Sequence, residues 1–131
     1  MTNREVVQNL NNLYAMQSRE EREEKAKLSI KVGYAVRKNI DVLNRVYKPY
    51  SESLEEIQKE YLTERKYDEA GQLEFIKEKG KTKENYERAV KELMDVENGD
   101  VGIHRIRLED LESCNSLTMA DQDALFFMIE E

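Results

Sequence analysis

Eight apolar or aromatic residues recur between positions 36 and 61 at alternating spacings of four and three. They are Val36, Ile40, Leu43, Tyr47, Tyr50, Leu54, Ile57 and Tyr61, and together they are called the seam. A heptad repeat kept over this length predicts one long helix with another helix packed along it. Tyrosines occupy three of the positions, and their hydroxyl groups need water or a hydrogen-bond partner, so a fully dry dimer interface is not expected.

Pro49 lies inside this repeat. Proline lacks the N–H of a helical hydrogen bond and its ring clashes with the preceding turn, at a cost of about 3 kcal/mol. The repeat nevertheless keeps its phase across Pro49, which favours a kinked continuous helix. Ser53 and Glu56 form a capping-box pattern that would instead begin a second helix, so this alternative stays open.

The helical pattern stops between Tyr61 and Thr82. Alternation around residues 66–76 predicts a short β-hairpin or an irregular loop there. A second helix should begin at Thr82 and end at Asn98-Gly99, because both of these residues tolerate the left-handed conformation of a helix C-terminus. We expect it to fold back antiparallel on the seam, with the rest of the seam covered by an N-terminal helix or by a second copy of the protein.

The N-terminal residues carry a capping-box pattern, Thr2 followed by Glu5, which predicts a helix over about residues 3–17. The run REEREEKAK (19–27) then mixes acids and bases without an apolar face. It is interpreted as either a solvated helical segment or the connection to the long helix.

The only histidine of the chain, His104, lies in GIHRIRLEDL (102–111), the most strand-like run of the sequence. Alternation predicts a strand that places His104, Ile106 and Leu108 on one face. His104 is therefore interpreted as a partly covered structural residue rather than a ligand. Asp110 or Ser113 should cap a short turn at the end of this strand.

A final helix is expected after Leu117, with Thr118 as its cap and Asp121 and Asp123 complementing its N-terminal dipole. The run ALFFMI (124–129) is apolar almost all round, so a helix there must be covered on more than one side. It is interpreted as the plug of the core, with a partner-binding surface as the alternative.

These patterns predict a mainly α fold with minor β structure: an antiparallel helical hairpin or small bundle, built on the long kinked helix. The 131 residues suffice to bury a core without metal or disulfide, so a single domain over residues 1–131 is expected. Within it we separate an N-terminal helix with its charged connection (1–27), the helical hairpin (28–98) and an acidic strand-turn-helix tail (99–131).

Enzymatic signatures are not found in the sequence. The five glycines are scattered rather than gathered in a phosphate loop, and no paired cysteines or histidines have metal-ligand spacing. The single histidine and the single cysteine, Cys114, could in principle act as base and nucleophile, but no further catalytic residue lies near them in the sequence. We therefore expect no catalytic activity, no metal site and no cofactor.

Acidic residues are concentrated at the C-terminal end. Residues 95–131 carry ten acids and two bases, whereas the rest of the chain holds 18 acids and 19 bases. Such a tail repels phosphates and membrane surfaces, so no direct nucleic-acid or membrane binding is expected, and it suits a basic protein partner. The sequence has no run of about 18 apolar residues, no signal-peptide pattern and no paired cysteines. These absences predict a cytoplasmic protein.

Three segments carry a resemblance: LSIKVGYAVRKNIDVL (28–43), VGIHRIRLEDLE (101–112) and LTMADQDALFFMIEE (117–131). Together they resemble a family of small proteins encoded by tailed phages and prophages of low-GC Gram-positive bacteria. The resemblance covers about a third of the chain and includes no catalytic motif. It implies a phage protein that works in the bacterial cytoplasm or in the virion, and it supplies no functional residues.

Two functions are consistent with these observations. The first is a non-enzymatic inhibitor that blocks a host nucleic-acid-handling defence protein, a CRISPR effector or a restriction nuclease, through its acidic tail. Its predicted contact residues are Glu109, Asp110, Glu112, Asp121 and Asp123, with Phe126 and Phe127 as apolar anchors. The alternative is a virion structural or assembly accessory protein, in a tail, neck or scaffold, that oligomerises through the 36–61 seam.

Overall fold

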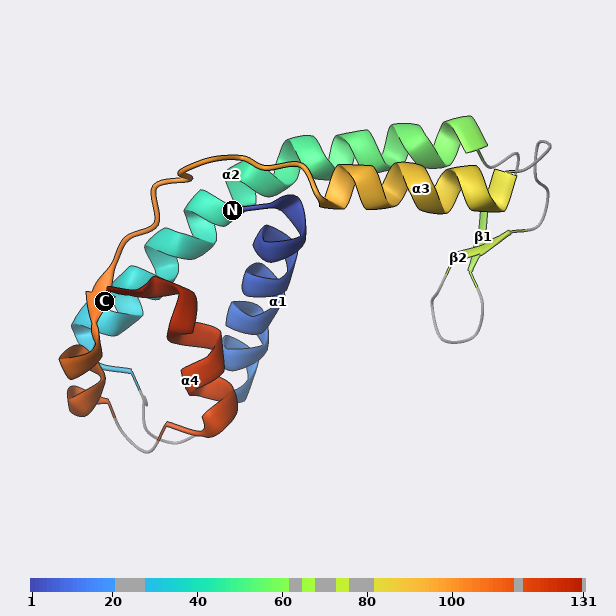
Figure 1. The fold of residues 1–131 in the computed structure, drawn as a ribbon. Coiled ribbons are helices and arrows are strands. Elements are labelled where there is room, and N and C mark those ends of the chain that lie inside the picture. Colours follow the sequence, from blue (N-terminus) through green and yellow to red (C-terminus); the bar gives the residue numbers. More distant parts are fainter. Residues whose placement is uncertain (21–27, 62–64, 68–72, 76–81, 115–116, 131) are drawn as a thin grey trace.

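The computed structural model describes residues 1–20, 28–61, 65–67, 73–75, 82–114 and 117–130, and the fold is mainly helical with minor β structure, as predicted (Figure 1). Its helices are α1 (Asn3–Glu20), α2 (Ile30–Tyr61), α3 (Thr82–Met94), α4 (Met119–Leu125) and the 3₁₀ helices η1 (Leu108–Ser113) and η2 (Phe126–Met128). Its strands are β1 (Arg65–Tyr67), β2 (Leu73–Phe75), β3 (Ile106–Arg107) and β4 (Ile129–Glu130).

The long helix α2 is continuous through Pro49, which confirms the kinked alternative. It begins earlier than the seam, where the hydroxyl of Ser29 accepts the N–H of Val32 at 3.4 Å. Figure 1 shows that the axis of α2 changes direction between its first half, beside α1, and its second half, beside α3. A bend is expected here because Pro49 cannot donate to the carbonyl of Arg45 and its ring pushes that turn apart.

The seam is covered within the chain. α1 packs on the first half of α2 and α3 packs antiparallel on the second half, and none of the eight seam side chains is exposed. Tyr50 is buried and its hydroxyl donates to the sulfur of Met94 at 3.1 Å, and burial raises its pKa. The seam is therefore not the free face that a homo-oligomer through residues 36–61 requires.

The chain turns at the far end of α2 and α3 through a β-hairpin, so the hairpin prediction is confirmed over the loop alternative. β1 and β2 pair antiparallel, with Arg65 opposite Phe75 and Tyr67 opposite Leu73. The second half of α2, α3 and this hairpin form an arm that projects from the rest of the molecule in Figure 1.

The prediction that the second helix ends at Asn98-Gly99 is wrong, because α3 ends at Met94. The residues that follow bind the N-terminal segment instead of continuing the helix: the N–H of Asn3 donates to the carbonyl of Val96 at 3.0 Å. The side-chain amide of Asn3 also donates to the carbonyl of Leu93, at 2.7 Å. Gly99 does adopt the left-handed conformation, with φ +71°, but as part of the connection to the tail.

The first helix begins as predicted. The N–H of Thr2 donates to a carboxylate oxygen of Glu5 at 3.0 Å, and the N–H of Glu5 donates to the Thr2 hydroxyl at 3.2 Å, which completes the capping box. The helix continues to Glu20, three residues beyond the expected end. Most of the charged run after it, residues 21–27, lies outside the described residues.

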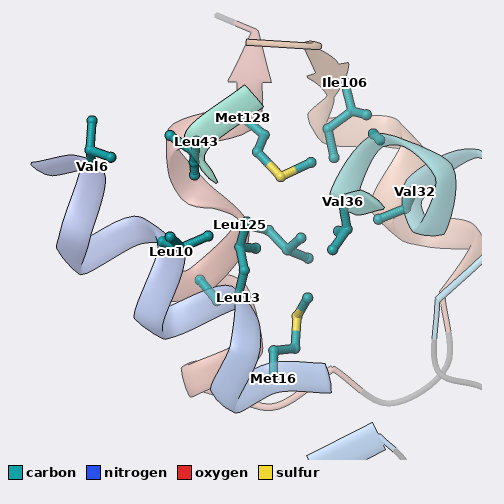
Figure 2. Close-up of a cluster of buried hydrophobic side chains, with 12 residues drawn as sticks. Val6, Leu10, Leu13, Met16, Val32, Val36, Leu43, Ile106, Leu125 and Met128 are labelled. Atoms are coloured by element: carbon teal, nitrogen blue, oxygen red, sulfur yellow. The ribbon is translucent and has the colours of Figure 1, made fainter. Parts of the chain in front are cut away.

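The hydrophobic core lies between α1, the first half of α2 and the C-terminal elements. Its largest fully buried apolar side chains are Val6, Leu13, Val32, Val36, Leu43, Ile106, Leu125 and Met128. In Figure 2, side chains from α1 and α2 converge on Leu125 and Met128. The core interpretation of ALFFMI is therefore confirmed for Leu125 and Met128, whereas Phe126 is 73% exposed.

The final segment is not one helix, which corrects the sequence prediction. The capping box forms as expected, with the N–H of Asp121 donating to the Thr118 hydroxyl at 3.1 Å. α4 then ends at Leu125, and the chain passes through η2 into β4. β4 pairs in parallel with β3, with Ile106 opposite Ile129. In this pairing the backbone groups of β4 form hydrogen bonds with β3, whereas in a longer helix they would have bonded within the helix.

The predicted strand is shortened to two residues, and its predicted alternation is wrong. Ile106 is 1% exposed, but Leu108 is 67% exposed and His104 is exposed too. The reason is that the 3₁₀ helix η1 begins at Leu108 and ends the extended conformation. Upstream, Asn39 of α2 takes the place of a neighbouring strand: its side chain accepts the N–H of His104 at 2.6 Å and donates to the His104 carbonyl at 2.9 Å.

Replacing Asn39 by alanine is expected to lower the free energy of unfolding by about 2 kcal/mol, because both backbone groups of His104 lose their partner. Urea denaturation followed by circular dichroism measures this loss, and faster hydrogen exchange at the His104 amide would locate it. The control is Asn44→Ala, on the exposed side of the same helix. Its amide donates only to the solvent-exposed hydroxyl of Tyr14, at 2.9 Å, so a loss of about 0.5 kcal/mol or less is expected. Equal losses in the two variants would contradict the bracing role of Asn39.

Candidate functional site

The acids predicted to contact a partner are divided by the structure between internal and external roles. Asp110 has an internal role: its carboxylate accepts the N–H of Arg107 at 2.8 Å and pairs with the ammonium group of Lys31 at 3.0 Å. The hydrogen bond from Arg107, followed by that from Lys31, holds the pKa of Asp110 below its usual range. Asp110 therefore caps η1, as predicted for the end of the strand, and ties η1 to α2.

Asp121 is not available to a partner, which corrects its assignment as a contact acid. It is 1% exposed, and one carboxylate oxygen accepts from the guanidinium group of Arg19 at 2.9 and 3.3 Å. The other oxygen accepts the N–H of Thr118 at 3.1 Å. Asp121 thus joins the start of α4 to the end of α1.

Glu109 and Glu112 do lie on the surface. With Glu130 and Arg107 they surround a shallow hollow of about 640 Å³, in which Leu108 is 67% exposed. Arg107 neutralises part of this charge through an ion pair with Glu109 at 3.5 Å. This acidic hollow, defined by Arg107, Leu108, Glu109, Glu112 and Glu130, combines three carboxylates with an exposed aliphatic side chain.

Asp123, Phe126 and Phe127 lie together at a second place, a groove of about 650 Å³ between α1 and α4. Phe126 is 73% exposed, whereas Phe127 is half-buried and its carbonyl accepts from Arg105 at 2.7 Å. Polar residues of α1 line the opposite wall, so this groove has a mixed rather than an acidic character. The seven predicted contact residues therefore do not form one surface.

The histidine and the cysteine each contact other residues. The ring of His104 meets the ring of Tyr34 edge to face, with centroids 5.8 Å apart, and Cys114 is half-buried against Ser29. Among the described residues, no group of three histidine, cysteine or carboxylate side chains is placed to hold a metal ion. In that same part of the chain, no helix has the length and apolar character needed to cross a membrane.

Three members of the acidic hollow were missed from the sequence: Arg107, Leu108 and Glu130. Glu130 lies 20 residues beyond Asp110 and reaches the hollow only because β4 pairs with β3, which places Glu130 opposite Arg107. Leu108 was assigned to a covered strand face. No local signal marked its exposure, which follows from the start of η1 at Leu108.

Comparisons of the chain with protein-family models, with curated proteins and with solved structures found no match. The resemblance to phage-encoded proteins therefore stays a prediction, as do the cytoplasmic location and the lack of enzymatic activity.

Proposed function

We propose that this chain is a non-enzymatic, phage-type protein-binding module that inhibits a host nucleic-acid-handling defence protein, a CRISPR effector or a restriction nuclease. The acidic hollow is the proposed contact surface. Carboxylates presented on a rigid support compete with phosphates for the arginine and lysine side chains of a nucleic-acid-binding groove.

The observation that carries this proposal is the exposure of Leu108 among three carboxylates. An acidic surface that served only solubility would not need a large aliphatic side chain, 67% exposed, among its carboxylates. An apolar anchor surrounded by charged groups is the usual arrangement of a protein contact, because the anchor supplies affinity and the charges supply specificity. The alternative virion role lacks comparable support, since the seam is covered.

The test measures DNA cleavage by purified CRISPR effectors and restriction nucleases in the presence of the protein. We expect inhibition of a susceptible nuclease, and about tenfold or greater weakening of it by the double substitution Glu109→Lys/Glu112→Lys, since two attractive contacts become repulsive.

The matched control is Glu84→Lys/Glu87→Lys on α3, where both glutamates are exposed and the change in net charge is the same. This variant should inhibit as well as the unchanged protein. Inhibition that survives the substitutions in the acidic hollow, or that is lost equally in the control, would overturn the assignment. A lack of inhibition across the nucleases would refute the defence-protein target itself.

A further inference from the structure

The exposed side of the first half of α2 has the opposite charge to the tail. Its basic residues are Lys31, Arg37, Lys38, Arg45 and Lys48, all exposed, and they are called the basic stripe. Asp41 is the only acid of the sequence between Ile30 and Lys48, and it pairs with Arg45. Arg37 and Lys38 form no ion pair with any residue that the structure describes, so their charges face solvent.

Apolar groups accompany these charges. Ile30 is 93% exposed and Tyr34 is 55% exposed, and both lie on the same side of α2 as Arg37 and Lys38. The ammonium group of Lys38 lies 5.7 Å from the centre of the Tyr34 ring. Ile30 is therefore a large exposed aliphatic side chain beside an aromatic ring and two cations that have no ion-pair partner among the described residues. This combination is typical of a binding surface.

The basic stripe and the acidic hollow are neighbours on one molecule. They meet where Lys31, the first base of the stripe, pairs with Asp110 of η1 at 3.0 Å. Their chemistry is complementary: cations with exposed Ile30 on one side of this boundary, carboxylates with exposed Leu108 on the other. One chain thus carries two surfaces, the basic stripe and the acidic hollow, that are complementary in charge.

We propose that the basic stripe binds the acidic hollow of a second copy of this chain. Because the two surfaces adjoin, a two-fold axis near their boundary brings each stripe onto the hollow of the other copy, so the contact is made twice in a closed dimer. Arg37 and Lys38 then face Glu109 and Glu112, and the exposed aliphatic side chains lose contact with water. The inference does not rest on the proposed inhibition, and because both contacts use the acidic hollow, the hollow of one copy makes only one of them at a time.

Sedimentation equilibrium of the full chain tests this contact. The unchanged protein is expected to dimerise reversibly. The double substitutions Arg37→Glu/Lys38→Glu and Glu109→Lys/Glu112→Lys should each weaken dimerisation about tenfold or more, because each places like charges together. An equimolar mixture of these two variants should dimerise again, because every reversed charge meets its complement, and a folding defect in either variant would not be rescued by mixing.

A second mixture tests whether the change in net charge alone explains the rescue. Glu84→Lys/Glu87→Lys has the same net charge as Glu109→Lys/Glu112→Lys but keeps both surfaces, so it should dimerise with itself and leave Arg37→Glu/Lys38→Glu largely monomeric. If labelled Arg37→Glu/Lys38→Glu enters dimers as readily in this mixture as in the first, the pairing of stripe and hollow is overturned. A monomeric unchanged protein at all concentrations, or no rescue in the first mixture, would do the same. If the unchanged protein stays monomeric yet binds a labelled single-stranded oligonucleotide, and Arg37→Glu/Lys38→Glu does not, the stripe contacts nucleic acid instead and the dimer is refuted.

Discussion

Replacing Asp121 by alanine is expected to lower the free energy of unfolding by about 2 to 4 kcal/mol. The substitution removes the acceptor of the Thr118 N–H and with it half of the α4 capping box. It also removes the partly buried ion pair with Arg19, which links α4 to α1. Charge-assisted hydrogen bonds to a carboxylate that water cannot reach contribute more than exposed ones, which places the expected loss above that of a simple helix cap.

Asp123→Ala is the matched control, since this aspartate lies two residues further along α4 and is exposed. A change of about 0.5 kcal/mol or less is expected for it. Urea denaturation of both variants, followed by circular dichroism at 222 nm, gives the comparison. If the two variants are equally stable, Asp121 is an ordinary surface acid and its placement in the structure is wrong.

Replacing Leu125 by alanine is expected to cost about 3 to 5 kcal/mol, because the site is closed on every side and a cavity would remain. Leu125 is 0% exposed and lies at the centre of the core, between the apolar residues of α1 and those of α2 (Figure 2). The loss should appear as a lower denaturation midpoint with little change in the dependence on urea concentration.

Phe126→Ala tests the same point from the opposite side. Phe126 follows Leu125 directly and is the larger residue, yet it is 73% exposed, so its truncation is expected to cost about 1 kcal/mol or less. A sequence-based ranking by side-chain size would give the reverse order. Greater destabilisation by Phe126→Ala than by Leu125→Ala would therefore contradict the packing of the C-terminal segment.

The parts of the fold that the sequence predicts correctly are those coded by residues close together in the chain. The seam identifies α2 and its direction of packing, and the pairs Thr2 with Glu5 and Thr118 with Asp121 mark the starts of α1 and α4. Each signal lies within one continuous stretch of the chain: four residues for each capping box, and residues 36–61 for the seam. The same periodicity favoured the continuity of α2 through Pro49 but left a second helix beginning at Ser53 open, and the structure decides for the continuous helix.

The tail is where sequence reasoning fails, because its conformation is decided by distant partners. Asn39 binds the backbone of His104 from 65 residues away, and β4 pairs with β3 only after the chain has passed through η1 and α4. Neither contact leaves a local pattern. The end of α3 was misplaced for the same reason, since the N-terminal segment competes for the backbone groups after Met94.

The candidate site was predicted in part. Charge identified Glu109 and Glu112, which are exposed, but charge alone does not distinguish them from Asp110 and Asp121, which bind within the fold. The difference lies in position relative to a cap: both internal acids are third residues of a helical turn, where a carboxylate can reach back to a free backbone N–H. For Asp121 that spacing is readable from the sequence, because Thr118 is a typical cap. For Asp110 it is not, because η1 begins after Arg107, which is not a typical cap residue.

One continuous helix, α2, belongs both to the core and to the arm. The angle of its bend at Pro49 therefore affects the direction in which the arm projects. The part of α2 beyond Pro49 is twelve residues long, which corresponds to about 18 Å of helix. A change of about 10° in the bend would therefore displace the β-hairpin by about 3 Å. The position of the hairpin thus depends on the geometry of one turn of helix, far from the strands themselves.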